Sequence, residues 1–118
     1  MNKRAYIYDL ETYKDIFLAC FIDIKSNQRF VFEISRRKNE FKQLEQFLRT
    51  QCGLLIGYNN LSFDYPIIHN LLSKKREEHA YYYNLANQLI NKRAYPYKVQ
   101  FIQQLDLFKI WHFDNPAV

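Results

Sequence analysis

The sequence predicts an α/β protein whose mixed sheet joins an antiparallel three-strand meander to parallel strands, with flanking helices. Three segments rich in β-forming residues follow one another in the first 34 positions, separated by short polar joints. Beyond residue 40 the apolar spacing changes from two to about 3.6 residues, which indicates helices. A short buried strand follows the first helix, and such a strand runs parallel to a neighbour because it returns through a crossover.

The first three strands are expected over residues 4–10, 15–24 and 29–34. The first, RAYIYDL, is rich in β-forming residues, and the second, DIFLACFIDI, is almost continuously apolar. The third, RFVFEI, alternates apolar side chains on one face. Because the joint KSNQ is a short polar turn, the second and third strands should form a hairpin.

The later elements follow the helical spacing of the apolar residues. In the first helix Asn39 is the expected N-cap, and Pro66 falls in the first turn of the second helix, where its missing N–H costs nothing. We expect a helix over 40–51, a strand over 53–58, helices over 63–74 and 78–92, and a last strand over 99–108. The order βββαβα(α)β is the ribonuclease H-like plan.

Length and composition predict a single domain over residues 1–118. A chain of 118 residues buries a modest core, and no apolar segment approaches the ~20 residues that a membrane span requires. The N-terminal segment MNKRAYIYDLE lacks the apolar stretch and cleavage site of a signal peptide. We therefore expect a cytoplasmic protein with no membrane partner.

Charge and cysteine content narrow the function classes only slightly. The formal net charge of +5 favours a polyanionic partner such as nucleic acid, but the basic clusters at 36–38 and 74–76 are typical of solvated helix ends. Cys20 and Cys52 form no CxxC motif, so we expect two buried thiols rather than a disulfide or a zinc site. The three histidines are scattered and share no ligand spacing.

Two carboxylates in the first strand are the first candidate site residues. Asp9 and Glu11 stand two positions apart, so both point to the same face of the sheet, about 6.5–7 Å apart along the backbone. Two neighbouring anions are unfavourable unless a cation neutralises them, and oxygen ligands suit Mg²⁺ or Mn²⁺. The plainer interpretation is the solvated end of a strand.

A third carboxylate lies in the segment IGYNNLSFDYP at 56–66. The strand before it should run parallel to the first strand, so both end at the same edge of the sheet and Asp64 approaches Asp9 and Glu11. Ser62 is the expected N-cap of the helix that follows. A favourable interaction with the helix dipole explains Asp64 alone, but it leaves Asp9 and Glu11 unexplained.

These residues carry a resemblance to a known family. YDLET (8–12) and GYNNLSFDYP (57–66) resemble the Exo I motif (D-x-E-T) and the Exo II motif (N-x-x-x-F-D) of DEDD-type 3′–5′ exonucleases, of the DnaQ-like and family B DNA polymerase proofreading kind. LDLFKIWHFDN (105–115) is similar to the stretch after the fifth strand in phage members. A phage-encoded chain would work in the host cytoplasm.

The resemblance implies a metal-dependent 3′–5′ exonuclease acting on nucleic acid, with DNA expected. Asp9, Glu11 and Asp64 would hold two Mg²⁺ or Mn²⁺ ions about 3.5–4 Å apart for phosphodiester hydrolysis. The site would take a single-stranded 3′ end, with Thr12 on the terminal nucleotide, Asn59 on the backbone and Phe63 stacked on a base. Phe63 is equally compatible with a core position. A polymerase domain or a downstream part of the same parent protein is the expected protein partner.

One family motif has no counterpart. Exo III supplies a fourth carboxylate as Y-x-x-x-D or H-x-x-x-x-D, and no tyrosine or histidine here has an aspartate at that spacing; the nearest case, Tyr83, is followed by Asn87. The sequence is therefore interpreted as a domain truncated before Exo III, with little or no activity of residues 1–118 alone. Asp106 is more typical of an N-cap for LFKIWHF than of a metal ligand, and Asp114, before Asn115 and Pro116, indicates a turn.

Two alternatives stay open beside the exonuclease. A non-catalytic ribonuclease H-like module could bind nucleic acid or protein, although clustered anions do not help a protein to bind phosphates. Another two-metal nuclease or nucleotidyl transferase would also place carboxylates here.

The first two strands carry apolar residues on both faces, so the sequence also predicts an exposed apolar strip beside the carboxylates and a tendency to self-associate.

Overall fold

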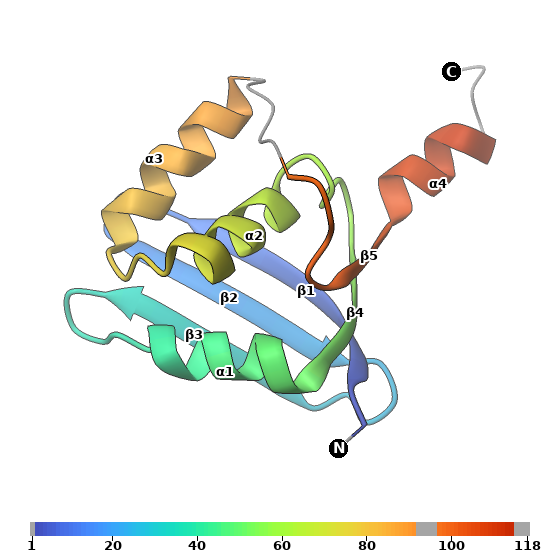
Figure 1. Ribbon diagram of the computed structural model, residues 1–118, viewed down its shortest axis with the longest axis horizontal. Coiled ribbons are helices and arrows are strands. Elements are labelled where there is room, and N and C mark those ends of the chain that lie inside the picture. The colour runs from blue at the N-terminus through green and yellow to red at the C-terminus, as the bar shows by residue number, and fades with distance from the viewer. Residues whose placement is uncertain (1, 92–96, 115–118) are drawn as a thin grey trace.

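The computed structural model describes residues 2–91 and 97–114, which form a five-stranded mixed sheet with helices (Figure 1). The strand order is β3-β2-β1-β4-β5, in which β1–β2 and β2–β3 pair antiparallel and β1–β4 and β4–β5 pair parallel. The predicted fold class is confirmed: a meander continues into parallel strands. The strands are β1 (Arg4–Thr12), β2 (Ile16–Asp23), β3 (Arg29–Ser35), β4 (Cys52–Gly57) and β5 (Gln103–Asp106).

Three helices of the described chain cover one face of this sheet. These are α1 (Phe41–Gln51), α2 (Asp64–Lys74) and α3 (His79–Ile90), while α4 (Leu107–Asp114) extends from the end of β5, away from the other three (Figure 1). The burial along β1 has a period of two, because Tyr6, Tyr8 and Leu10 are buried under the helices whereas Ile7 and Asp9 are exposed on the opposite face.

An aromatic cluster fills the space between α1 and the sheet. The Phe47 ring of α1 lies 4.9 Å from that of Phe21 and 5.0 Å from that of Tyr6, measured between ring centroids. Phe30 and Phe32 of β3 complete the cluster at 4.9 and 5.2 Å from Phe47. These side chains come from alternate positions on three strands, which explains the period-two apolar pattern of the first 34 residues.

The opposite face of the sheet, which we call the open face, is covered by none of α1, α2 and α3. One apolar row crosses four strands on it, because Ile22 pairs with Ile7, Ile7 with Ile56 and Ile56 with Leu105. Ile7 is 48% exposed. The predicted apolar strip beside Asp9 and Glu11 is therefore present.

Several predicted boundaries are wrong. The last strand spans only Gln103–Asp106 instead of 99–108, and a helix begins at Leu107, where the Asp106 carboxylate accepts the Phe108 N–H at 3.0 Å. This is the N-cap role expected for Asp106.

The expected N-cap of α2 is wrong. Ser62 does not cap the helix, because α2 begins at Asp64 and Phe63 is the preceding residue. Asp114 ends α4, and the turn expected at 115–116 lies outside the described residues.

The expected cap of α1 is also displaced by one position. Glu40, rather than Asn39, directly precedes the helix, although the Asn39 Oδ1 atom still accepts the Phe41 N–H at 3.0 Å. The predicted helix over 78–92 begins at His79 and ends at Ile90, and Lys92 lies outside the described residues.

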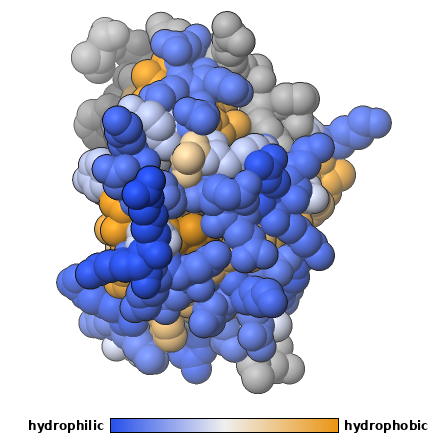
Figure 2. Space-filling view, turned by 90° about the vertical axis from the view of Figure 1, so that its left-hand side faces the viewer, coloured by the Kyte–Doolittle hydropathy of each residue, from blue (hydrophilic) through white to orange (hydrophobic). Residues whose placement is uncertain are grey.

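The basic clusters are paired at one polar end of the molecule. The cluster at 36–38 lies in the β3–α1 loop, and the cluster at 74–76 spans the last residue of α2 and the start of the α2–α3 loop. The hydrogen bond from Asn39 to Glu77 brings the two loops together, and the space-filling view of this end is largely hydrophilic (Figure 2). Ion pairs engage cations of both clusters: Arg37–Glu33, Lys38–Glu40, Lys75–Glu45 and Arg76–Glu78. The cluster at 74–76 is thus a helix end, as expected, whereas the cluster at 36–38 lies in a loop before α1, and carboxylates of neighbouring elements pair with cations of both clusters.

Two other sequence predictions concern cysteines and membranes. Cys20 and Cys52 are both free thiols, as expected, but only Cys52 is buried; the expected burial of Cys20 is wrong, because its side chain lies half-buried on the open face. No helix in the described part of the chain is long and apolar enough to cross a membrane.

Candidate carboxylate site

Asp9 and Glu11 lie on the open face near the end of β1, where the buried positions Tyr8 and Leu10 alternate with them. The Tyr13 hydroxyl donates to the Glu11 carboxylate at 3.1 Å. Partial burial and then the neighbouring Glu11 carboxylate raise the pKa of Asp9 above its ordinary value. The two anions therefore interact unfavourably in the metal-free protein.

The Asp64 side chain bonds to the backbone of β1 beyond the point where the pairing of β1 with β4 ends. The parallel pairing of β1 with β4 ends at Ile7 and Ile56, but β1 continues to Thr12, so the Leu10 N–H has no β4 carbonyl opposite it. The Asp64 Oδ2 atom accepts this N–H at 3.1 Å from the first residue of α2. As Leu10 lies between Asp9 and Glu11 in the chain, the contact brings Asp64 to the same end of β1.

Burial makes Asp64 an unusual carboxylate. Its side chain is only 8% exposed, and this burial is the main cause that raises its pKa to about 7. The Leu10 N–H lowers the pKa, whereas the charges of Asp9 and Glu11 raise it further. The ionised form is therefore disfavoured near neutral pH, which is a property more typical of functional sites than of structural carboxylates.

No side-chain cation balances these three carboxylates in the described residues, whose ion pairs all lie elsewhere. Oxygen-only ligands with uncompensated negative charge suit a hard divalent cation. The three carboxylates are not close enough to form a metal centre in their present positions. The described chain contains no group of three His, Cys, Asp or Glu side chains that could hold an ion without moving. The donor type and charge thus fit a metal, and a bound ion would have to draw the side chains together.

Asp106 organises the loop that leads to Asp64. Its carboxylate, which is buried, accepts the backbone N–H of Asn59 at 2.8 Å and of Leu61 at 3.0 Å, in addition to that of Phe108. Asn59 has a left-handed backbone conformation with φ of 58°, which asparagine tolerates better than most residues. Both carboxylate oxygens of Asp106 accept hydrogen bonds, so this residue fixes the loop to the end of β5. We call these contacts the Asp106 clamp.

A second network, centred on the half-buried Gln104 and missed by sequence reasoning, joins β1, β5 and the same loop. The Gln104 Oε1 atom accepts hydrogen bonds from the Tyr8 hydroxyl at 2.7 Å and from Asn60 Nδ2 at 2.8 Å. Asn60 is fully buried, and its backbone carbonyl accepts the Tyr65 N–H at 2.7 Å. A Cβ atom at Gly57 would lie 3.0 Å from the Asn60 side chain, so glycine leaves room for it. The available signal was a glycine three residues before this asparagine, Gly57 before Asn60.

The three predicted substrate residues lie in different environments. Thr12 is half-buried at the end of β1, and the Asn59 side chain is exposed. Phe63 is half-buried and packs against the core cluster. The ring of Phe63 thus has one side in the protein and part of its surface toward solvent, which permits both a core role and a stacking role.

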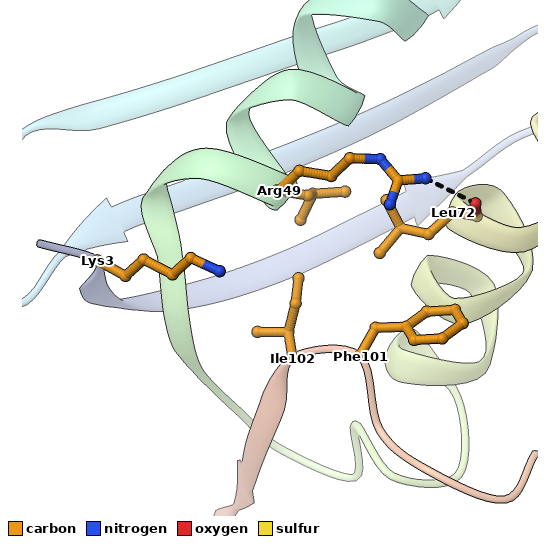
Figure 3. A pocket seen from close by; sticks show the side chains of 6 residues that line it. Lys3, Arg49, Leu72, Phe101 and Ile102 are labelled. Carbon is orange, nitrogen blue, oxygen red and sulfur yellow. Dashed lines mark hydrogen bonds between the residues drawn. The ribbon is translucent and has the colours of Figure 1, made fainter. Parts of the chain in front are cut away.

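A pocket of about 280 Å³ lies at the opposite end of β1 (Figure 3). Lys3 and Arg49 line it together with Phe101, Ile102 and two leucines. Arg49 donates to the Leu72 carbonyl at 2.9 Å and to Glu45, so its guanidinium is already engaged. Since Lys3 and Asp9 are six residues apart along an extended chain, roughly 20 Å, this pocket is separate from the carboxylates.

Comparison with known proteins identifies no relative: no protein-family model, no curated protein and no solved structure matches the chain.

Proposed function

We propose that this chain is a metal-dependent 3′–5′ exonuclease domain that acts on single-stranded nucleic acid ends, with DNA as the expected substrate. The observation that carries the proposal is Asp64, a buried carboxylate with a pKa of about 7 beside Asp9 and Glu11 and without a compensating cation among the described residues. Keeping such a group costs stability at neutral pH, so a function in cation binding accounts for it better than a structural role does.

The residues divide into two roles under this proposal. Asp9, Glu11 and Asp64 hold Mg²⁺ or Mn²⁺, and Asp64 gives up its proton when a cation is held, because its pKa is close to neutral. When bound, the ions supply the charge that activates a water and stabilises the leaving 3′-oxygen. Thr12, Asn59 and Phe63 orient the terminal nucleotide, and the clamp by Asp106 fixes the loop that carries two of them.

The proposal is tested by the dependence of oligonucleotide binding on both Mn²⁺ and a free 3′ end. We expect a linear single strand to bind more tightly with Mn²⁺ than without it, and a circular strand of the same sequence to show no such gain. Asp9→Asn and Asp64→Asn should remove the gain, whereas Asp15→Asn, at an exposed position of the β1–β2 turn, should keep it. Little or no cleavage is expected in the same reaction, because the sequence supplies no fourth carboxylate; products shortened from the 3′ end would identify the chemistry.

The rival function, a non-catalytic nucleic-acid-binding module, gives the opposite result. Linear and circular strands would then bind equally, Mn²⁺ would not matter, and both aspartate variants would bind at least as well as the parent protein because they carry less negative charge.

Phe63 provides a second test, of the substrate role. Replacing it by leucine keeps an apolar side chain against the core but removes the aromatic face, so oligonucleotide binding should weaken by about 1–3 kcal/mol while the melting temperature changes little. Phe63→Ala should weaken binding and also lower the melting temperature. If Phe63→Leu binds normally and only the alanine variant is destabilised, Phe63 is a core residue and the stacking role is wrong.

A further inference from the structure

We propose that Tyr58, supported by Phe108, stacks on a second base of the single-stranded nucleic acid whose 3′ end enters the carboxylate site. The proposal rests on the proposed function and deepens it, because it adds a contact beyond the terminal nucleotide. Three features support it: the position of Tyr58 at the carboxylate edge of the sheet, the exposure of its ring, and the Asp106 clamp that holds both aromatic residues.

Tyr58 lies at the edge of the sheet where the carboxylates gather. The last pair between β1 and β4 joins Ile7 to Ile56, and Asp9 and Tyr58 each follow this pair by two residues along parallel strands. Neighbouring strands lie about 4.8 Å apart, so the backbone of Tyr58 begins close to that of Asp9. Tyr58 is also the first residue of the loop that leads to Asp64.

The Tyr58 side chain is unusually exposed for an aromatic residue. It is 62% exposed, more than Tyr13 and Phe101, which are both 55% exposed. An exposed ring adds little to the stability of the fold, because apolar area stabilises only where it is removed from water. Its surface is instead available to a flat ligand such as a nucleobase.

The Asp106 clamp holds the two aromatic residues through one oxygen atom. Asp106 Oδ1 accepts the N–H of Asn59, the residue after Tyr58, at 2.8 Å and the N–H of Phe108 at 3.0 Å. The rings of Tyr58 and Phe108 meet edge to face, with 5.2 Å between their centroids and 78° between their planes. A ring that is already held in place loses little conformational freedom when a ligand binds, which favours affinity.

Stacking suits a nucleic acid that has to approach three carboxylates. No ion pair of the described residues places a cation against Asp9, Glu11 or Asp64, so phosphates at this edge depend on bound metal ions for neutralisation. Bases are uncharged, and an aromatic ring binds any of them without a cation. Since Phe63 at the other end of the loop is the expected partner of one base, Tyr58 is assigned to a different base.

The affinity for a linear oligonucleotide in Mn²⁺ tests the role of Tyr58. Tyr58→Leu should weaken binding by about 5- to 150-fold, the effect of losing one stacked base, whereas Tyr58→Phe keeps the ring and should bind like the parent protein. Phe101→Leu is the matched control, because Phe101 is a similarly exposed aromatic residue beside the pocket at the opposite end of β1. A lower melting temperature of Tyr58→Leu with unchanged binding would show that the ring only packs on Phe108, and it overturns the proposal.

Oligonucleotides that lack a single base locate the contact. Abasic positions placed one at a time from the 3′ end should reveal two sensitive positions in the parent protein, one for each ring. One of these positions should become insensitive in Tyr58→Leu and the other in Phe63→Leu, because the missing base and the missing ring remove the same contact. One sensitive position in the parent protein, or two in Tyr58→Leu, contradicts a second stacking contact.

Failure of stacking at Tyr58 is distinguishable from failure of the exonuclease proposal. If Mn²⁺ gives linear oligonucleotides no gain in affinity, the exonuclease proposal fails, but a loss in Tyr58→Leu that one abasic position reproduces still supports stacking at Tyr58. If the gain is present and Tyr58→Leu binds every oligonucleotide as the parent protein does, the exonuclease proposal stands and stacking at Tyr58 is overturned.

Discussion

Asp64→Asn is expected to make the metal-free protein more stable at pH 8 and, in the same molecule, to remove Mn²⁺ binding. Burial raises the pKa of Asp64 from 3.8 to about 7, so the folded protein holds this proton more tightly than the unfolded chain does. Stability is therefore lost as the pH rises from about 4 to about 7 and stays low above that range. Asparagine has no charge to bury and keeps an oxygen for the Leu10 N–H.

The size and the pH window of this effect are specific. A shift of this size corresponds to a gain on the order of 2–4 kcal/mol at pH 8 for the variant, which should disappear near pH 4. Thermal unfolding between pH 4 and pH 8 in the presence of a chelator measures it, with Asp15→Asn as the control. A variant that is less stable than the parent protein at pH 8 would show that the Asp64 carboxylate is structural.

Asp106→Ala should destabilise the protein more than the loss of the Asp9, Glu11 or Asp64 carboxylate does. It leaves the N–H groups of Asn59, Leu61 and Phe108 without their acceptor, and each buried N–H that loses its partner costs roughly 1–3 kcal/mol. We expect a total loss of about 3–5 kcal/mol, because part of the loop can relax toward water.

Two measurements follow this change. Urea unfolding gives the free-energy difference, and hydrogen exchange of the Asn59 and Leu61 amides reports whether the loop opens locally. Mn²⁺ affinity should also fall, since the clamped loop leads directly to Asp64. An unchanged urea midpoint with unchanged exchange at both amides would refute the clamp.

The elements of the fold were predictable because their signals are local. The alternation of β1 placed Tyr8 and Leu10 inside and Asp9 and Glu11 outside, and the change of apolar spacing located α1 and α2. The approach of Asp64 to β1 also followed from sequence, because parallel strands end at one edge of a sheet. The periods of strands and helices and the handedness of crossovers are sufficient for these predictions.

The details that depend on the β4–β5 register were not predictable. Gly57 pairs with Asp106, and this register alone allows Asp106 to reach Asn59 and Leu61, which leaves Phe63 rather than Ser62 before α2. The part-buried contacts of Gln104 with Tyr8 and Asn60 have the same origin. The paired residues are 96 and 44 positions apart, so no local sequence pattern indicates these contacts.

The central claim is that Asp9, Glu11 and Asp64 form a divalent cation site, and proton release on Mn²⁺ binding tests it most directly. Calorimetric titration with Mn²⁺ at pH 6.5, in two buffers of different ionisation enthalpy, separates the heat of binding from the heat of proton transfer. We predict saturable binding with release of a proton from Asp64, because its pKa of about 7 leaves it largely protonated at this pH. Asp64→Asn should abolish both signals; Mn²⁺ binding that is absent in the parent protein, or equal in the two proteins, would contradict the account.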